Sequence, residues 1–416
     1  MCLNSHVKQA HASRLSRRGL LSTVIPAGMF AAGAAAQQPA QTPAAMMERF
    51  RQMSKDAEAK GLAQAFKGLT TNGTVEPDLF AVKKTGVSTA GVRSAAERFV
   101  ESLNPAQRSR AMFTVDDPEW RKWMNQHFYR RQGVGFDEMD GRQRDAAFAL
   151  VRSGLSARGF DLARNIMRLN ETLAELTNDH VGLGEWLYYI TIMGKPSATE
   201  PWGWQLDGHH CIVNYFVLGD QVVMTPHFFG SEPVKATSGK YKGTTILQEE
   251  QNRGLEMLTT LGEPLRKKAV LEFSKTGNNN LTEAFKDNVV LDYAGARVAD
   301  MAAAEKKRLV ELVDLYVANM DEGHARVKMD EVRKHLDRTA FAWIGASDAE
   351  SVFYYRIHSP VILIEFDHQT PANLRNLPGA KRTPDREHIH CVVRTPNGND
   401  YGKDLLRQHY LSHKHA

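Results

Sequence analysis

The sequence has no long hydrophobic run beyond its N-terminal segment and no excess of charge of one sign. A membrane-spanning helix needs about 20 consecutive apolar residues, and no such run follows residue 36. The chain has 53 Lys and Arg, but four of them (Lys8, Arg14, Arg17 and Arg18) precede residue 37, which leaves 49 against 48 Asp and Glu, a net charge of +1. The sequence therefore predicts no stable membrane anchor and no clustered basic surface for nucleic acid.

Cysteine is scarce, with three residues in 416. Cys2 lies in the N-terminal segment, so only Cys211 and Cys391 remain for the body of the protein. An oxidising compartment would allow a disulfide between them, and the sequence leaves open whether it forms.

Familiar catalytic motifs are absent as well. The chain contains no G-x-S-x-G nucleophile elbow, no Walker A loop, no complete G-x-G-x-x-G, no H-E-x-x-H and no EF-hand loop. These absences argue against several large enzyme classes, including the α/β-hydrolases, P-loop enzymes, dinucleotide-binding enzymes and zincin metalloproteases.

What the N-terminus does contain is a twin-arginine pattern. Arg17 and Arg18 precede a mildly apolar, Ala- and Gly-rich stretch that ends in small residues at Ala36. This order of features is typical of a cleaved export signal. We expect residues 1–36 to be a signal peptide, 37–44 a flexible tether and 45–416 a single domain. The twin-arginine export machinery would be a partner of the chain and would carry it to the periplasm or out of the cell.

Hydrophobic periodicity predicts an α+β protein. The N-terminal half is mostly helical, and strand-like segments from the middle and the C-terminal part would form one mixed or antiparallel sheet with helices packed on it. Predicted helices cover 46–66, 90–103, 118–126, 141–155, 160–176, 245–261, 297–320, 324–336 and 402–411. Predicted strands cover 185–193, 205–218, 221–226, 341–344, 352–358, 361–366 and 388–394, with a hairpin turn at Gly219-Asp220 and a capping box at Thr245 and Gln248.

A histidine pattern is the strongest chemical signal. His388 and His390 lie two residues apart in a β-type run and therefore share one face, and Glu365 lies in another apolar strand, where burying an unpaired carboxylate would be costly. Together with His209 or His210 they would form a site for one Zn, Fe or Mn ion. Alternatively, these histidines are only hydrogen-bonded, and Glu365 pairs with an arginine.

Strand parity distinguishes the two adjacent histidines. If the segments around Cys211 and Cys391 are neighbours in one sheet and both thiols lie on the same buried face, His210 lies with His388 and His390. His209 would then be a packing or hydrogen-bonding group. A β-bulge would reverse this assignment.

Other polar and aromatic residues are also candidates for the site. Arg356 and Arg394 could clamp an anionic substrate or neutralise nearby carboxylates, and His409 could act as a general acid or base or be an exposed histidine. Asp207 could orient a histidine ligand, as could Asn214, or either could belong to a turn or a strand end. Trp202 and Trp204 could stack on a ligand, although core packing is favoured.

Several short motifs together resemble the bacterial domain-of-unknown-function family numbered 3500. The resemblance spans residues 45–412 and implies one contiguous domain with a polar site, but it implies no reaction. A departure is Ser359, where a glycine is expected before Pro360. The segments that carry the resemblance are residues 194–197, 202–210, 226–230, 247–250, 356–360, 364–367, 388–390 and 400–406, with Asn214, Gly243, His409 and Tyr410.

These observations favour an exported enzyme that uses a single metal ion, most consistent with hydrolysis of a small-molecule substrate. Two alternatives stay open. Two histidines and a carboxylate also suit a mononuclear iron oxygenase, and a periplasmic protein that binds a ligand or metal without turnover would need the same residues.

Overall fold

The computed structural model describes residues 43–412. The predicted signal peptide and all but the last two residues of the predicted tether lie outside this range, as does the C-terminal tail from residue 413. Of the described residues, 44–412 belong to one compact unit. The first helix begins at Pro43, so helical structure starts inside the segment expected to be a tether.

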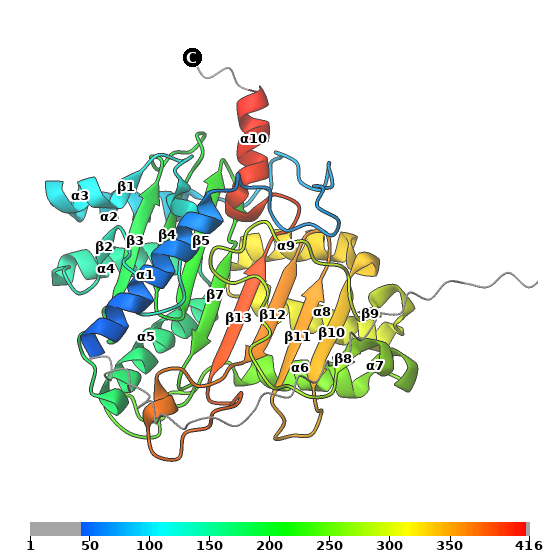
Figure 1. Ribbon diagram of the computed structural model, residues 1–416. Helices are drawn as coiled ribbons and strands as arrows, with labels where there is room; N and C mark the ends of the chain where they lie inside the picture. Colours follow the sequence, from blue (N-terminus) through cyan, green and yellow to red (C-terminus); the bar gives the residue numbers. More distant parts are fainter. Residues whose placement is uncertain (1–42, 413–416) are drawn as a thin grey trace, which may run out of the picture. The chain divides into compact units, whose positions relative to one another are not determined.

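A single mixed sheet of 13 strands organises the described part of the chain (Figure 1). Ten strands follow one another in the order β1-β3-β4-β5-β7-β13-β12-β11-β10-β8, while β2 pairs with β3, β6 with β5 and β9 with β10. The β1–β3 and β10–β8 pairs are parallel and the other pairs are antiparallel. The predicted α+β class is therefore confirmed. The strands are β1 (Met112–Phe113), β2 (Val134–Gly135), β3 (Tyr188–Met193), β4 (Trp202–Gly208), β5 (Cys211–Leu218), β6 (Gln221–Val223), β7 (His227–Ser231), β8 (Val270–Glu272), β9 (Ala296–Arg297), β10 (Ala340–Gly345), β11 (Phe353–His358), β12 (Leu363–His368) and β13 (Ile389–Arg394).

Helices lie on both faces of the sheet. In Figure 1, α1 crosses in front of β3, β4 and β5, whereas α5, α8 and α9 lie behind the strands. The larger hydrophobic core joins this rear layer of helices to the sheet. The α-helices are α1 (Pro43–Leu62), α2 (Ala90–Ser102), α3 (Pro105–Ala111), α4 (Gly141–Gly154), α5 (Ala157–Thr177), α6 (Gln248–Thr260), α7 (Glu263–Ala269), α8 (Ala303–Val317), α9 (Glu322–Lys334) and α10 (Lys403–Ser412).

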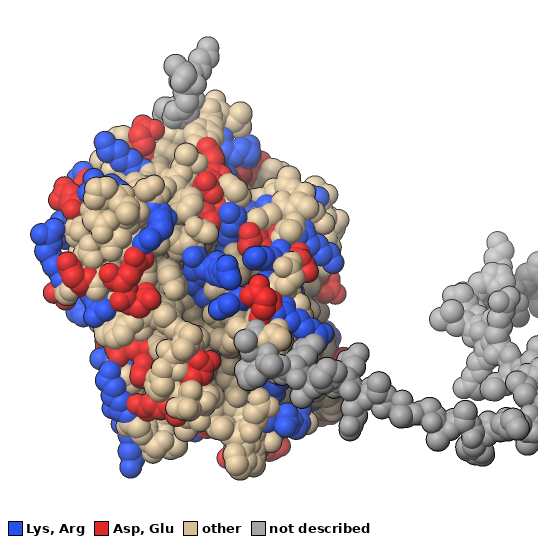
Figure 2. All heavy atoms as spheres, turned by 60° about the vertical axis from the view of Figure 1, so that its left-hand side comes forward, with Lys and Arg blue, Asp and Glu red and all other residues tan. Residues whose placement is uncertain are grey.

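The surface carries both signs of charge. On the face shown in Figure 2, basic and acidic side chains lie intermixed. No helix among residues 43–412 is long and apolar enough to cross a membrane.

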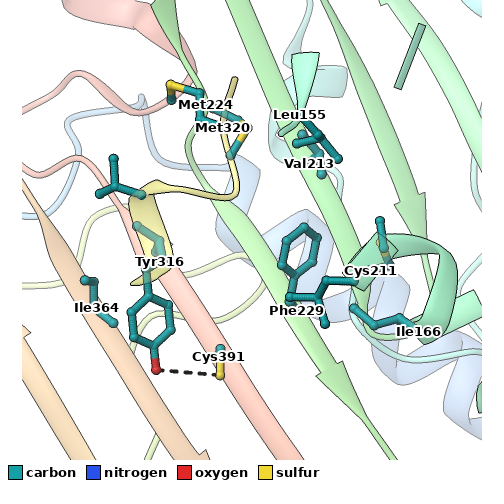
Figure 3. Close-up of a cluster of buried hydrophobic side chains, with 14 of the residues drawn as sticks. Leu155, Ile166, Cys211, Val213, Met224, Phe229, Tyr316, Met320, Ile364 and Cys391 are labelled. Carbon is teal, nitrogen blue, oxygen red and sulfur yellow. Dashed lines mark hydrogen bonds between the residues drawn. The ribbon is translucent and has the colours of Figure 1, made fainter. Parts of the chain in front are cut away.

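The central strands separate two kinds of environment. Cys211 and Cys391 both lie opposite Phe229 of β7 in the sheet register, so all three side chains point into the rear core (Figure 3). The two thiols are free and buried. Because a whole strand lies between them, they do not form the disulfide that the sequence left open. Phe228 and Val392, one residue away, point to the front face.

Some predicted elements need correction. The predicted strand over 205–218 is interrupted at His209 and His210, which connect β4 to β5 as a tight hairpin. The helix predicted over 118–126 is a single 3-10 turn, Pro118–Arg121. The helix predicted from residue 297 begins at Ala303, because β9 and another 3-10 turn precede it.

The predicted capping box before α6 is also wrong. Thr245 forms an isolated bridge with Lys235 instead of capping the helix. The residue before α6 is Leu247, which has a φ of 58° and makes no side-chain cap. The strand β7 was not predicted, since its five residues follow Pro226 and lack a clear alternation of polar and apolar residues.

Candidate metal centre

Three buried histidines converge on the front face of the sheet. His388 Nε2 lies 3.0 Å from His390 Nε2, which in turn lies 3.0 Å from His210 Nε2. One ring nitrogen from each of the three lies within 4.8 Å of the others. Zn–N bonds of about 2.0–2.1 Å in a tetrahedral site separate ligand nitrogens by about 3.3 Å. The two spacings at His390 are therefore close to those between ligands around one ion.

Local backbone structure explains this convergence. His388 immediately precedes β13 and His390 lies within it, so their side chains leave the strand on the same side. His210 is the second residue of the β4–β5 hairpin and has a φ of 60°, which is uncommon for a residue other than glycine. Its amide donates to Asn125 O at 3.1 Å and its carbonyl accepts from Gly230 N at 2.9 Å. The loop at Asn125 and the strand β7 thus fix a backbone conformation that turns this imidazole toward β13.

Hydrogen bonds at the other ring nitrogens fix the tautomers of two histidines. His388 Nδ1 lies 3.0 Å from the carbonyl oxygen of Thr370, and a carbonyl can only accept, so this nitrogen carries the proton. His390 Nδ1 lies 2.7 Å from Glu283 Oε1, where a carboxylate selects the same tautomer. In the neutral rings, both Nε2 atoms then present lone pairs to each other at 3.0 Å. A cation between them would turn this repulsion into coordination.

Burial keeps the imidazoles in the form that binds metals. The pKa of His210 is lowered well below its usual value by burial, and further by the neighbouring His390 and His388. The pKa of His390 is lowered for the same reason, with His388 adding to the effect. Metal ligation requires neutral imidazole, so both side chains are ready to coordinate at neutral pH.

His209 does not join the cluster. Its Nδ1 lies 2.7 Å from Asn170 Oδ1 on α5, and its ring stacks on His210 with centroids 4.0 Å apart. The structure thus brings His210, and not His209, to His388 and His390, as parity predicted. The strand β7 lies between β5 and β13, contrary to the assumption that the two are neighbours, but the register across it leaves the alternation of faces unchanged.

Glu365 lies outside the cluster, which corrects its expected place among the ligands. Its carboxylate accepts hydrogen bonds from Leu281 N and Thr282 N, both at 2.9 Å, and from the hydroxyl groups of Thr282 and Tyr354. A buried carboxylate is costly only when it lacks partners. Here four donors stabilise the charge without a cation.

The two arginines that were candidates for binding substrate serve structural contacts. Arg394 is fully buried, with its guanidinium 2.7 Å from Asp400 and from Asp287 and 2.8 Å from the carbonyl oxygen of Thr282. Arg356 donates to the carbonyl oxygen of Asp292 at 3.3 Å. Neither arginine lines the pocket at the histidines, and neither pairs with Glu365.

The remaining polar candidates also lie apart from the cluster. Asp207 accepts from Arg131 Nε at 3.0 Å, and burial raises the pKa of its carboxyl to about 6 despite that arginine. His409 on α10 lies 3.6 Å from Glu200, at the other end of the sheet. Asn214 bonds to Gln205 and to the carbonyl oxygen of Pro226.

The two tryptophans belong to the core, as favoured from the sequence. Trp202 and Trp204 are both fully buried. Trp204 stacks on Tyr215 with ring centroids 5.2 Å apart, and Trp202 Nε1 donates to the carbonyl oxygen of Ser197. Neither side chain presents a face to a ligand.

The histidines form part of the wall of a pocket of about 440 Å³. Sequence reasoning missed Glu283 and Thr370, the two acceptors that orient the ring nitrogens, because both lie in irregular segments with no periodicity. It also missed Glu232, which lines the pocket and accepts the backbone N–H groups of Ala372, Asn373 and Leu374. The only available signal was that Glu232 and Thr370 closely follow the strands β7 and β12, and Glu283 has no strand nearby in the sequence.

This geometry defines an α+β protein with a three-histidine cluster at a pocket. A family model described as a protein of unknown function (DUF3500) matches residues 85–403. The chain belongs to this family, which confirms the resemblance seen in its motifs. Comparisons with curated proteins and with solved structures gave no match.

Proposed function

We propose that His210, His388 and His390 bind a single divalent transition metal ion through their Nε2 atoms and that the protein is a metal-dependent hydrolase. The observation that carries this proposal is the orientation of the rings. The Nδ1 atoms of His388 and His390 donate to oxygen acceptors, which leaves their Nε2 atoms free to bind a metal. His210 Nε2 lies 3.0 Å from His390 Nε2, on the wall of the same pocket.

A cluster of three histidines favours zinc and hydrolysis over the alternatives. Catalytic zinc sites have three protein ligands and one open position, and the bound water loses a proton near neutral pH. The pocket gives a substrate access to that position. The iron oxygenase alternative uses two histidines and one carboxylate, and no described carboxylate joins this cluster. Iron and manganese remain outcomes of the test, not part of the proposal.

Elemental analysis of the purified protein tests the metal, and hydrolysis tests the reaction. We expect one zinc ion per chain and hydrolysis of 4-nitrophenyl acetate that a chelator abolishes and added zinc restores. His388→Ala should lose both, whereas His180→Ala, a change at a half-exposed histidine, should lose neither. Iron in the wild-type protein would favour oxygen chemistry, and a protein that takes up no metal would exclude both enzyme interpretations.

We also propose that the protein is exported after folding. The twin-arginine pattern at Arg17 and Arg18 supports this location. The mass of the protein recovered from the periplasm should correspond to a chain that begins near Gln37, and replacing both arginines by lysine should leave it in the cytoplasm. A periplasmic chain that still begins at Met1 would refute processing.

A further inference from the structure

The pocket beside the histidine cluster has one apolar wall, and that wall comes from α1. Phe50 and Met53 line the pocket, and the Phe50 ring stacks on Phe128 with centroids 5.2 Å apart. Met53 is 55% exposed. Burying such apolar surface against a ligand is favourable, so this wall offers contact area to a hydrocarbon group.

The wall is fixed in place by contacts from the rest of the protein. Tyr129 donates to Glu58 of α1 at 2.6 Å, and Arg121 donates to the carbonyl oxygens of Gly61 and Gln64 at 2.9 and 3.0 Å. A wall that is already ordered spares a ligand the cost of ordering it. The helix precedes residues 85–403, which match the family model, whereas all three histidines lie within that range.

Another part of the pocket lining is polar and includes a cation. Arg375 lines the pocket from the 3-10 turn Leu374–Asn376, and it belongs to none of the ion pairs among the described residues. Glu232, by contrast, already accepts three backbone N–H groups of the same segment. Glu283 is likewise paired, with His390. Arg375 lines the same pocket as these two carboxylates, which already have hydrogen-bond partners. Its guanidinium can therefore pair with a carboxylate on the ligand.

We propose that the substrates are acyl amides or esters that carry a carboxylate, with the apolar acyl group against α1 and Phe128 and the carboxylate at Arg375. This inference rests on the proposed hydrolytic function. In the reaction the oxygen of water bonds to the acyl carbon, the bond from that carbon to nitrogen or oxygen breaks, and a proton from water passes to the leaving group. A carboxylic acid and an amine or alcohol result.

Calorimetric titration of the zinc-loaded protein tests the acyl wall. The probes are N-hexanoylglycine and N-acetylglycine, which differ by four CH₂ groups. Because each fully buried CH₂ contributes about fourfold in affinity, contact with one wall should favour the hexanoyl compound by about tenfold or more. Phe50→Ala and Met53→Ala should each reduce this preference, while Met46→Ala, on the same helix but outside the pocket lining, should preserve it.

The carboxylate is tested with N-hexanoylglycinamide, the neutral counterpart. Arg375→Ala should weaken the binding of N-hexanoylglycine by about threefold to fivefold and leave the binding of the amide unchanged. The reason is that the substitution removes only a partner for the charged carboxylate. Arg382→Ala, an exposed change nearby in the chain, should affect neither probe. Equal affinities for both acyl lengths, an unchanged affinity in the Arg375 variant, or no binding of any probe would overturn the proposal.

The outcomes separate the two proposals. Selective binding without release of glycine from any probe, and without zinc-dependent hydrolysis of 4-nitrophenyl acetate, would refute the hydrolase while leaving the ligand class in place. Zinc-dependent hydrolysis of 4-nitrophenyl acetate without acyl or carboxylate selectivity would refute the ligand class alone.

Discussion

Replacing each of two adjacent histidines by alanine separates metal ligation from packing. His210 supplies one of three nitrogens that converge, whereas the nearby ring of His209 bonds to Asn170. Structural zinc sites with four ligands bind zinc with about 10–16 kcal/mol, or about 2.5–4 kcal/mol per ligand. His210→Ala should therefore weaken zinc binding by about 100- to 1,000-fold. His209→Ala should cost about 1 kcal/mol of folding stability, for one lost hydrogen bond.

Competition with a chromophoric zinc chelator measures the zinc affinity of each variant. Chemical unfolding of the same samples gives their folding stability. The two variants serve as controls for each other, since they delete the same side chain at consecutive positions of one hairpin. Loss of zinc from the His209 variant, with full affinity in the His210 variant, would refute the assignment. Equal and large losses in both would show that the hairpin, not the ligand, was changed.

Three further outcomes are expected. Glu283→Ala should weaken zinc binding by about 10- to 100-fold, because His390 loses the acceptor that orients it; an unchanged affinity by chelator competition would contradict this role. Glu365→Gln should keep one zinc per chain by elemental analysis but lose about 2–4 kcal/mol of stability to urea, because Thr282 loses a charged acceptor; the reverse result would restore Glu365 as a ligand. The third outcome concerns pH. A zinc site of three histidines with the ordinary pKa of about 6.5 would lose about 50-fold in zinc affinity between about pH 7.5 and 6.0, because protons compete with the metal. Because burial lowers the pKa values of His210 and His390, protons compete only in more acidic solution, and a loss of about tenfold or less is expected.

Periodicity and parity predicted what depends on alternation along strands. The pairing of His388 with His390 needed only the two-residue repeat of a strand. The choice of His210 agrees with the structure, although its premise was wrong, because His210 lies in the hairpin turn before β5 and not in a strand. The strand β7 lies between β5 and β13, but Cys211 and Cys391 still share a face, because residues that pair across adjacent strands point to the same side of the sheet and both cysteines pair with Phe229. The α+β class followed from the same repeats.

Contacts made by irregular segments could not be predicted in this way. Glu365 has the residue type and the face expected of a ligand, but its carboxylate accepts the amides of Leu281 and Thr282, which no periodic pattern places there. Glu283 reaches His390 from the same segment. The His209-His210 hairpin was missed because neither residue is a usual turn former, although Gly208 precedes them.

The separation of Cys211 from Cys391 by a full strand has a consequence for biogenesis. Both thiols are enclosed by the rear core, and burial raises their pKa values well above normal, which suppresses the reactive thiolate. The described part of the fold therefore contains no disulfide that an oxidant would have to form. The proposed export of the folded chain requires that its structure be completed in the reducing cytoplasm, and a core whose cysteines need no pairing can be assembled there in full.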